Sequence, residues 1–142
     1  MSKFSDYTEG QIIESTLRGA AFVVPSAIYI ALFTADPTDA NVTGGEVGTG
    51  AFPAYVRKDA SNGSGGVASG WTANANGVSS NAKAITFPAN NGAGTVVVTH
   101  IGIYDAATGG NLIYHAPLVT PKSLLVGDVL SFGIGAITVT VA

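Results

Sequence analysis

The segment THIGIYDAATGGNLIYH contains both histidines of the chain, His100 and His115, together with an aspartate, Asp105. Histidine and aspartate are residue types that carry general acid–base chemistry or bind transition metals. At a turn, however, the Asp105 carboxylate can accept hydrogen bonds from backbone amides, while Gly109 and Gly110 can adopt positive φ. A β-hairpin turn therefore explains Asp105 and the glycine pair without any chemistry.

The role of the histidines depends on the register of this hairpin. If Tyr104 pairs with Leu112, strand alternation places His100 and His115 on opposite faces, and a shift of one residue places them opposite each other. No carboxylate lies near in the sequence to orient either ring, as a metal site or a general base requires. We therefore expect ordinary strand residues, with a pH-sensitive or metal-binding pair as the alternative.

Three acids, Asp36, Asp39 and Glu46, lie in one turn-rich segment that follows an apolar strand. Their carboxylates could hold calcium through oxygen ligands, although their spacing does not match an EF-hand. Glycine-rich loops also carry acids for turns and solvation, which is the interpretation we favour.

The stretches NANG and NNGAG are expected to be connections, with contacts to sugars as the alternative. No serine has a G-x-S-x-G setting and no cysteine is present, so we predict no catalytic residue, no cofactor and no metal.

The composition favours a single domain that packs against other subunits. The chain has 142 residues, which suits one domain, and only 11% of them are charged, against roughly 25% in an average domain. The six lysines and arginines form no basic stripe, which disfavours nucleic-acid binding, and the adjacent Arg57 and Lys58 are expected at an exposed strand end. The apolar stretches are too short to span a bilayer, and the first residues do not read as a signal peptide. We therefore expect synthesis in a cytosol and no membrane partner.

One helix is predicted over Asp6–Arg18. Asp6 can act as the N-cap, Glu9 three residues later completes a capping-box-like pair, and Gly19 is a typical C-terminal stop. The segments that follow are β-rich, with strands expected over 27–35, 54–58, 83–87, 94–104 and 111–115 and two short ones near the C-terminus. Pro88 is expected to close a strand, and Pro117 and Pro121 to bracket a short connection. Seven or eight strands separated by turns predict a mainly β, single-domain, antiparallel β-sandwich or jelly-roll-like fold with a short amino-terminal helix or arm.

We divide the chain into an amino-terminal helix or arm, residues 1–19, and a β-sandwich domain, residues 20–142. The apolar side chains of the helix can pack on the sandwich of their own chain or extend to a neighbouring subunit. The single tryptophan can anchor the core or a subunit contact. The predicted interface residues are Phe4, Tyr7, Ile12, Ile13, Leu17 and Trp71.

The order of motifs along the chain resembles a known family. The most specific are ALFTADPTDA, THIGIYDAATGGNL and the carboxyl-terminal series TPK, VGD, F, GA and TV. From about Leu17 to Val141 the chain resembles small virion proteins of tailed bacteriophages, often labelled tail fibre protein. The resemblance implies a structural component of the virion without catalysis, and its motifs identify no catalytic residue.

A small β domain with an amino-terminal arm also resembles capsid decoration, or cement, proteins. This leads us to expect a homotrimer that binds the major capsid protein at capsomer junctions and stabilises the head after synthesis in the host bacterial cytoplasm. The alternative is a tail-fibre or tail-tip module that binds a host receptor or glycan. A glycan hydrolase would need two carboxylates about 5–9.5 Å apart across a cleft. The nine acids are scattered mostly through turns and give little support to an enzyme.

Overall fold

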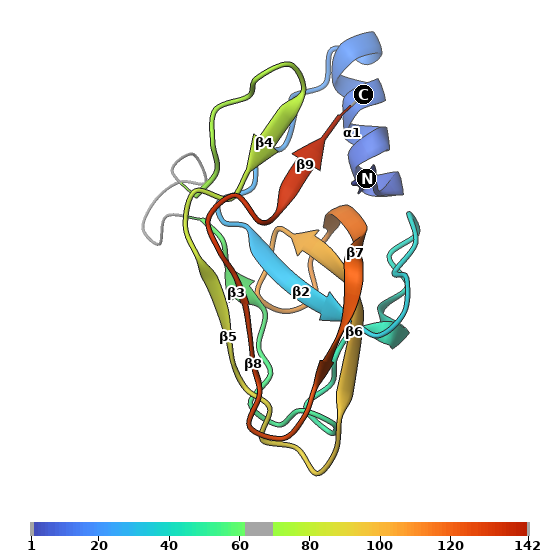
Figure 1. Ribbon diagram of the computed structural model, residues 1–142. Helices are drawn as coiled ribbons and strands as arrows, with labels where there is room; N and C mark the ends of the chain where they lie inside the picture. The colour runs from blue at the N-terminus through green and yellow to red at the C-terminus, as the bar shows by residue number, and fades with distance from the viewer. Residues whose placement is uncertain (1, 62–69, 142) are drawn as a thin grey trace.

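Antiparallel β-structure and one amino-terminal α-helix make up residues 2–61 and 70–141, which a computed structural model describes (Figure 1). The elements are β1 (Lys3–Phe4), α1 (Asp6–Arg18), β2 (Tyr29–Phe33), the 3₁₀ turn η1 (Thr43–Gly45), β3 (Lys58–Asp59), β4 (Val78–Ser80), β5 (Ile85–Ala89), β6 (Val96–Tyr104), β7 (Leu112–Leu124), β8 (Val129–Phe132) and β9 (Thr138–Thr140). Every pair of strands in the described ranges is antiparallel. The predicted fold class, mainly β with a short amino-terminal helix, is confirmed.

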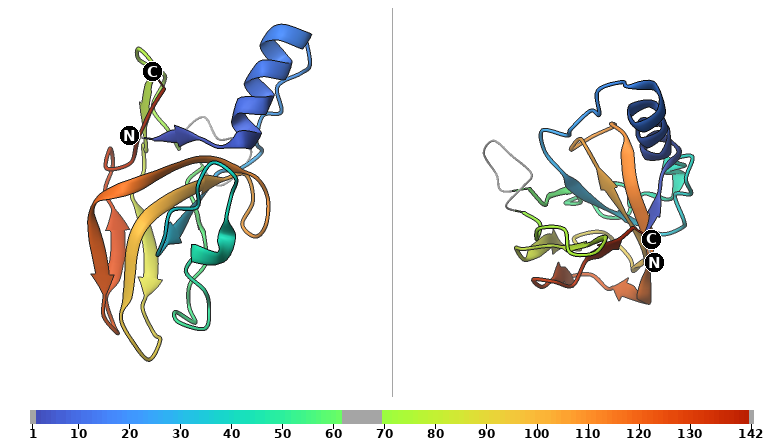
Figure 2. Two further views of the ribbon diagram at one scale, coloured as in Figure 1. Left: turned by 90° about the vertical axis from the view of Figure 1, so that its right-hand side faces the viewer. Right: turned by 90° about the horizontal axis from the view of Figure 1, so that it is seen from above.

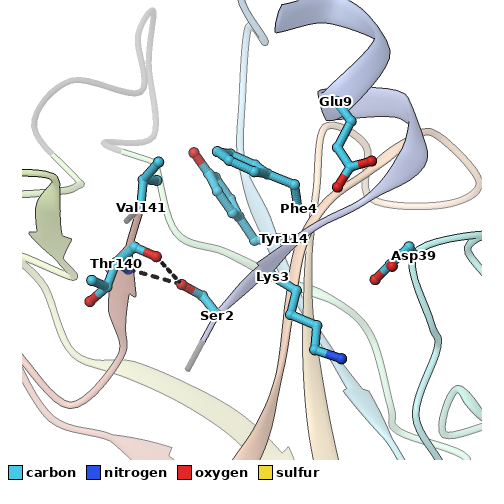
Figure 3. Close-up of a pocket in the computed structure, with 8 residues that line it drawn as sticks. All are labelled: Ser2, Lys3, Phe4, Glu9, Asp39, Tyr114, Thr140 and Val141. Carbon is cyan, nitrogen blue, oxygen red and sulfur yellow. Dashed lines mark hydrogen bonds between the residues drawn. The ribbon is translucent and has the colours of Figure 1, made fainter.

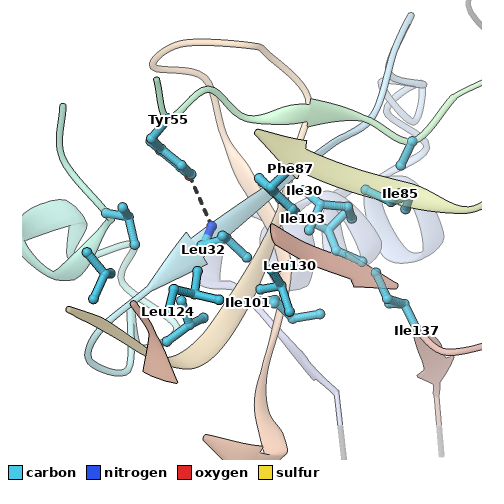
Figure 4. Packing of buried hydrophobic residues seen from close by; sticks show 14 of the residues in the cluster. Ile30, Leu32, Tyr55, Ile85, Phe87, Ile101, Ile103, Leu124, Leu130 and Ile137 are labelled. Carbon is cyan, nitrogen blue, oxygen red and sulfur yellow. Dashed lines mark hydrogen bonds between the residues drawn. The ribbon is translucent and has the colours of Figure 1, made fainter. Parts of the chain in front are cut away.

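The strands form two layers with the main core between them. A five-stranded sheet has the order β1-β7-β6-β2-β3, and the pairs β4-β9 and β5-β8 form two smaller sheets. Alternation along β2 sends Ile30 and Leu32 into the core, where residues of β5, β6 and β8 meet them (Figure 4). The Leu32 amide donates to the Tyr55 hydroxyl at 3.0 Å, so the loop after η1 is fixed to the core as well.

The helix has the predicted bounds, but its N-cap is Ser5 and not Asp6. The Ser5 hydroxyl accepts a hydrogen bond from the Thr8 amide at 3.3 Å, which satisfies one of the free donors of the first turn. Gly19 ends the helix with φ of 72°, the left-handed conformation that glycine adopts without strain. The chain had two adjacent polar residues that could cap this helix, and the structure uses the first.

Strand bounds near prolines were predicted wrongly. β5 continues through Pro88, and β7 continues through Pro117 and Pro121, where a short connection was expected. Beyond its short pairing with β1, the outer edge of β7 pairs with no other strand of the described residues, and an edge position tolerates a residue without an N–H. The strand expected over 54–58 is reduced to β3, because the Tyr55 amide bonds to the Phe52 carbonyl in a turn.

Trp71 is half-buried and packs against the main core. We expect Trp71→Ala to lower the free energy of unfolding by about 3 kcal/mol, because truncation removes a large apolar side chain and leaves a cavity. Urea denaturation measures this loss. A variant that keeps its stability but no longer associates with other subunits would instead assign Trp71 to an interface, as the sequence analysis allowed.

Candidate functional site

The two histidines share one face of the sheet, which the strand alternation did not predict. Tyr104 pairs with Leu112, but a bulge shifts the register by one residue beside this pair, so that His115 faces Gly102. Because Gly102 and His100 are two residues apart on β6, His100 and His115 point to the same side. The inference of opposite faces was therefore wrong, and its cause is a single extra residue in β7.

Carboxylates reach His115 from a part of the sequence that lies far away. The Asp36 Oδ1 atom is 3.1 Å from His115 Nδ1, and Asp39 Oδ1 is 2.8 Å from His115 Nε2. The pairing of Phe33 with His100 brings the loop after β2 to this face, and His100 Nε2 lies 3.9 Å from Asp36 Oδ2. His115 is only 2% exposed. The structure thus joins the two groups of residues that the sequence analysis treated as separate candidate sites.

The polar groups of this cluster contact one another. His115 Nε2 shares a hydrogen bond with Asp39 Oδ1, and Asp36 Oδ1 lies beside Nδ1. The Thr38 amide, followed by the charges of His115, His100 and Lys3, outweighs partial burial and lowers the pKa of Asp36 below its ordinary value of 3.8. No group of three or more His, Asp or Glu side chains within the described ranges is arranged to hold a metal ion.

The lowered pKa of Asp36 gives a pH dependence with a defined sign. A carboxyl group with a folded-state pKa below its unfolded value stabilises the protein above that value, and the contribution disappears as the pH falls through the folded-state pKa. Because Asp36 is partly exposed, we expect the effect to be less than about 1 kcal/mol. The difference in unfolding free energy between the wild type and Asp36→Asn should be present at pH 6 and shrink below pH 3.8. A difference that is constant down to pH 2 in urea titrations contradicts this assignment.

Glu46 does not join Asp36 and Asp39, so the three acids do not form the calcium site considered from the sequence. Its carboxylate binds Arg57 at two points, with Arg57 Nε donating to Oε1 at 2.7 Å and Nη2 donating to Oε2 at 2.7 Å. Arg57 was expected at an exposed strand end, but its side chain is 5% exposed. The guanidinium also lies 3.6 Å from the centre of the Tyr104 ring. The ion pair with Glu46 and the stacking on Tyr104 offset the cost of burying the charged guanidinium.

The Asp105 turn is the turn that the sequence predicts. Asp105 Oδ1 accepts from the Asn111 amide at 2.7 Å, and Gly109 and Gly110 have φ of 60° and 73°. Arg57 Nη1 donates to the Gly109 carbonyl at 2.7 Å and thereby fixes the turn to the rest of the sheet face. These residues position the hairpin and leave no free acid or base at its tip.

The two Asn/Gly stretches are connections. In NANG, Asn76 and Gly77 both have positive φ, and the Gly77 amide donates to Asn74 Oδ1 at 2.9 Å. In NNGAG, Asn90 is buried, and its Nδ2 donates to the Leu124 carbonyl at 2.8 Å. The side chain of Asn90 is therefore occupied within the protein and is not presented to a sugar.

The outer turns of α1 and the segment after it carry exposed apolar side chains. Helix α1 stands away from the β layers (Figure 2), and Thr8 is its only buried residue. Leu17 is 79% exposed. We define the arm surface as Ile13, Leu17, Phe22, Val23 and Val24, all of which are exposed. Exposed large apolar side chains are common where proteins contact partners, which makes this set a candidate interaction site.

The predicted interface residues are not all part of this surface. Ile13 and Leu17 belong to it, and Ile12 is half-buried beside them. Phe4 packs against Tyr114, with the two rings tilted and their centroids 5.3 Å apart. Tyr7 and Trp71 are half-buried as well, so the interface role of the whole set stays a prediction. The sequence analysis missed Phe22, Val23 and Val24, although the apolar run AAFVVP, which neither alternates nor has helical spacing, was a usable signal.

A cavity of about 250 Å³ lies at the base of α1, where the two ends of the described chain meet (Figure 3). The Ser2 hydroxyl accepts from the Thr140 amide at 2.9 Å and also bonds to the Thr140 carbonyl at 3.0 Å. Lys3, Glu9 and Asp39 line the cavity and are exposed. The base of α1 is thus surrounded by β1, β7 and β9.

Comparison with known proteins identifies the family. Residues 3–140 match the family model described as podophage GP4 fiber I protein gp80. A search of the curated proteins found no match. No helix within the described ranges has the length and the apolar character that crossing a bilayer requires. Because the match covers nearly the entire chain, the protein belongs to the podophage GP4 fiber I protein gp80 family and is a structural protein of a tailed-bacteriophage virion.

Proposed function

We propose that the protein is a non-enzymatic component of the tail fibre that binds neighbouring copies of itself through the arm surface. The observation that carries this proposal is the exposure of Ile13 and Leu17 on α1, which stands away from the β layers, and of Phe22, Val23 and Val24 in the segment after it. The family name supports the fibre location.

The energetics favour an arm that is covered in the particle. Burying apolar surface contributes roughly 25 cal/mol per Å², which must exceed the entropic cost of association. A helix of 13 residues is marginal by itself in water and gains stability when its apolar side is packed. Because few residues of the chain are charged, much of its surface can pack against a neighbour without burying a charge.

The arrangement of polar groups supports a structural role over a catalytic one. His115 shares a hydrogen bond with Asp39 and lies beside Asp36, Glu46 is paired with Arg57, and Asp105 caps a turn. These acids and bases are engaged in holding loops and strands together. The proposal therefore assigns no catalytic residue and no cofactor.

A second candidate is a capsid decoration protein that binds the major capsid protein at capsomer junctions, as a homotrimer. The feature that favours it is the combination of a small β body with one projecting apolar helix. Under this candidate the arm surface contacts the capsid shell. Under the fibre proposal, a host receptor would bind to a face of the β layers that lies outside the arm surface.

Counting copies in fractionated particles tests the location. Purified virions are separated into heads and tails, and the protein is quantified in each fraction by mass spectrometry against the major capsid protein. The fibre proposal expects tens of copies or fewer, all in the tail fraction. Hundreds of copies in the head fraction would overturn it and establish the decoration role.

A further inference from the structure

An apolar pocket of about 160 Å³ lies near the base of α1, between the five-stranded sheet and the β4-β9 pair. The residues that line it are Ile28, Trp71, Ser79, Ile103, Tyr114 and Val139. Ile103 and Val139 are buried and the other four are half-buried, so the lining extends from the core to the surface. Figure 1 and Figure 2 show α1 and the β4-β9 pair at the same end of the molecule.

The arm surface and this pocket are neighbours along the chain, but the arm surface does not fill the pocket. Ile28 follows Val24 by four residues, a span of at most about 14 Å. None of the residues of the arm surface lines the pocket. The Val23 amide donates to Gln11 Oε1 at 3.2 Å, which holds this segment along α1. In a single copy, the pocket and the arm surface therefore both remain open.

The two surfaces match in charge and in size. Residues 19–28, GAAFVVPSAI, include no charged side chain, and neither do the six residues of the pocket. A contact between them therefore buries no ion, which would be costly to remove from water. An apolar protein cavity of about 150 Å³ accommodates benzene, so this pocket has room for one aromatic ring. Phe22 is the aromatic residue of the arm surface, and it is 47% exposed.

We propose that the Phe22 ring of one copy enters this pocket on a neighbouring copy, where it packs against Trp71 and Tyr114. The inference rests on the proposed function and adds to it the surface that receives the arm. Tryptophan and tyrosine often dominate the binding energy of protein contacts, particularly in well-packed pockets. Each copy supplies one ring and one pocket, so the contact is heterologous. Its repetition builds a closed ring or an open filament of copies.

Cysteine cross-linking in virions tests this contact, because the chain has no cysteine of its own. Ala21→Cys places a thiol beside Phe22, and Ser79→Cys places one in the pocket lining. The two variants carry different tags and together complement a phage that lacks the gene, so a mixed dimer must join two copies. A short bis-maleimide should yield this mixed dimer, and the control pair Ala21→Cys with Ser131→Cys should not. Ser131 is a matched control, since it is also a strand serine with a hydrogen-bonded hydroxyl but lies outside the pocket.

A filled pocket gives a second measurement. Ser79→Trp should reduce incorporation into virions on the order of tenfold, whereas Ser131→Trp should be incorporated like the wild type. If Ser79→Trp does not fold, the cysteine pair decides.

The cross-links separate this inference from the proposed function. Absence of the mixed dimer, or normal incorporation of Ser79→Trp, overturns the inference. Dimers of Ala21→Cys with itself, without the mixed dimer, place one arm against another, which overturns the inference and leaves the proposed function intact. Cross-links of Ala21→Cys only to a different virion protein overturn both.

Discussion

Replacing Arg57 with alanine should lower the free energy of unfolding by about 3–5 kcal/mol, because it leaves the partly buried Glu46 carboxylate without its partner. Arg57 binds both oxygens of Glu46, donates to two carbonyls of the Asp105 turn and covers the ring of Tyr104. Burial raises the pKa of Tyr104 to about 12, so its hydroxyl remains a donor to Asn41 at neutral pH. One side chain thus joins the segment after η1, the Asp105 turn and β6.

Guanidinium chloride or thermal denaturation measures this loss, and two further variants show its origin. Arg57→Lys keeps the charge but not the bidentate geometry, so it should recover only part of the stability. The double variant Arg57→Met with Glu46→Gln removes both charges and should be less destabilised than Arg57→Ala. A loss below 1 kcal/mol in Arg57→Ala would show that the network contributes little.

The second large effect should appear in the particle and not in the isolated protein. We expect the double variant Leu17→Glu with Phe22→Glu to fold with unchanged stability, because both side chains are exposed, and to be incorporated into virions at least tenfold less than the wild type. The loss follows from placing two charges in an apolar contact that excludes water. Complementation of a phage that lacks the gene, followed by quantification in purified particles, measures incorporation.

The matched control is Val119→Glu, which places a charge on a fully exposed residue of β7 outside the arm surface. It should be incorporated like the wild type. Equal loss in both variants would indicate a general effect of surface charge, and equal retention would remove the arm surface from the account. These substitutions are sharper than deletion of residues 1–19, because β1 and the first turn of α1 bond to β7.

Local rules of sequence predicted much of the fold. Gly19 correctly marked the end of the helix, and the apolar patterns of residues 27–35 and 94–104 indicated the two strands that carry much of the core. The prolines of β7 were misread, because their tolerance depends on an edge position that only the sheet order reveals. The sequence offers no local indication of which strand lies at an edge.

The candidate site was less predictable, because its contacts join distant segments. The bulge beside Tyr104 reverses the face of His115, and a single inserted residue has no sequence signature here. Arg57 was taken for a surface residue, because its partner Glu46 becomes a neighbour only after the chain folds. The arm surface was half predicted: the helical spacing indicated Ile13 and Leu17, while the apolar residues after Gly19 followed no period.

A reconstruction of the intact virion, at a resolution that shows side chains where this protein is bound, tests the central claim most directly. We predict that Leu17 and Phe22 are buried against a neighbouring subunit, with the β layers on the outside of the contact. Finding these residues exposed to solvent in the particle, with the protein held through another face, would contradict the account.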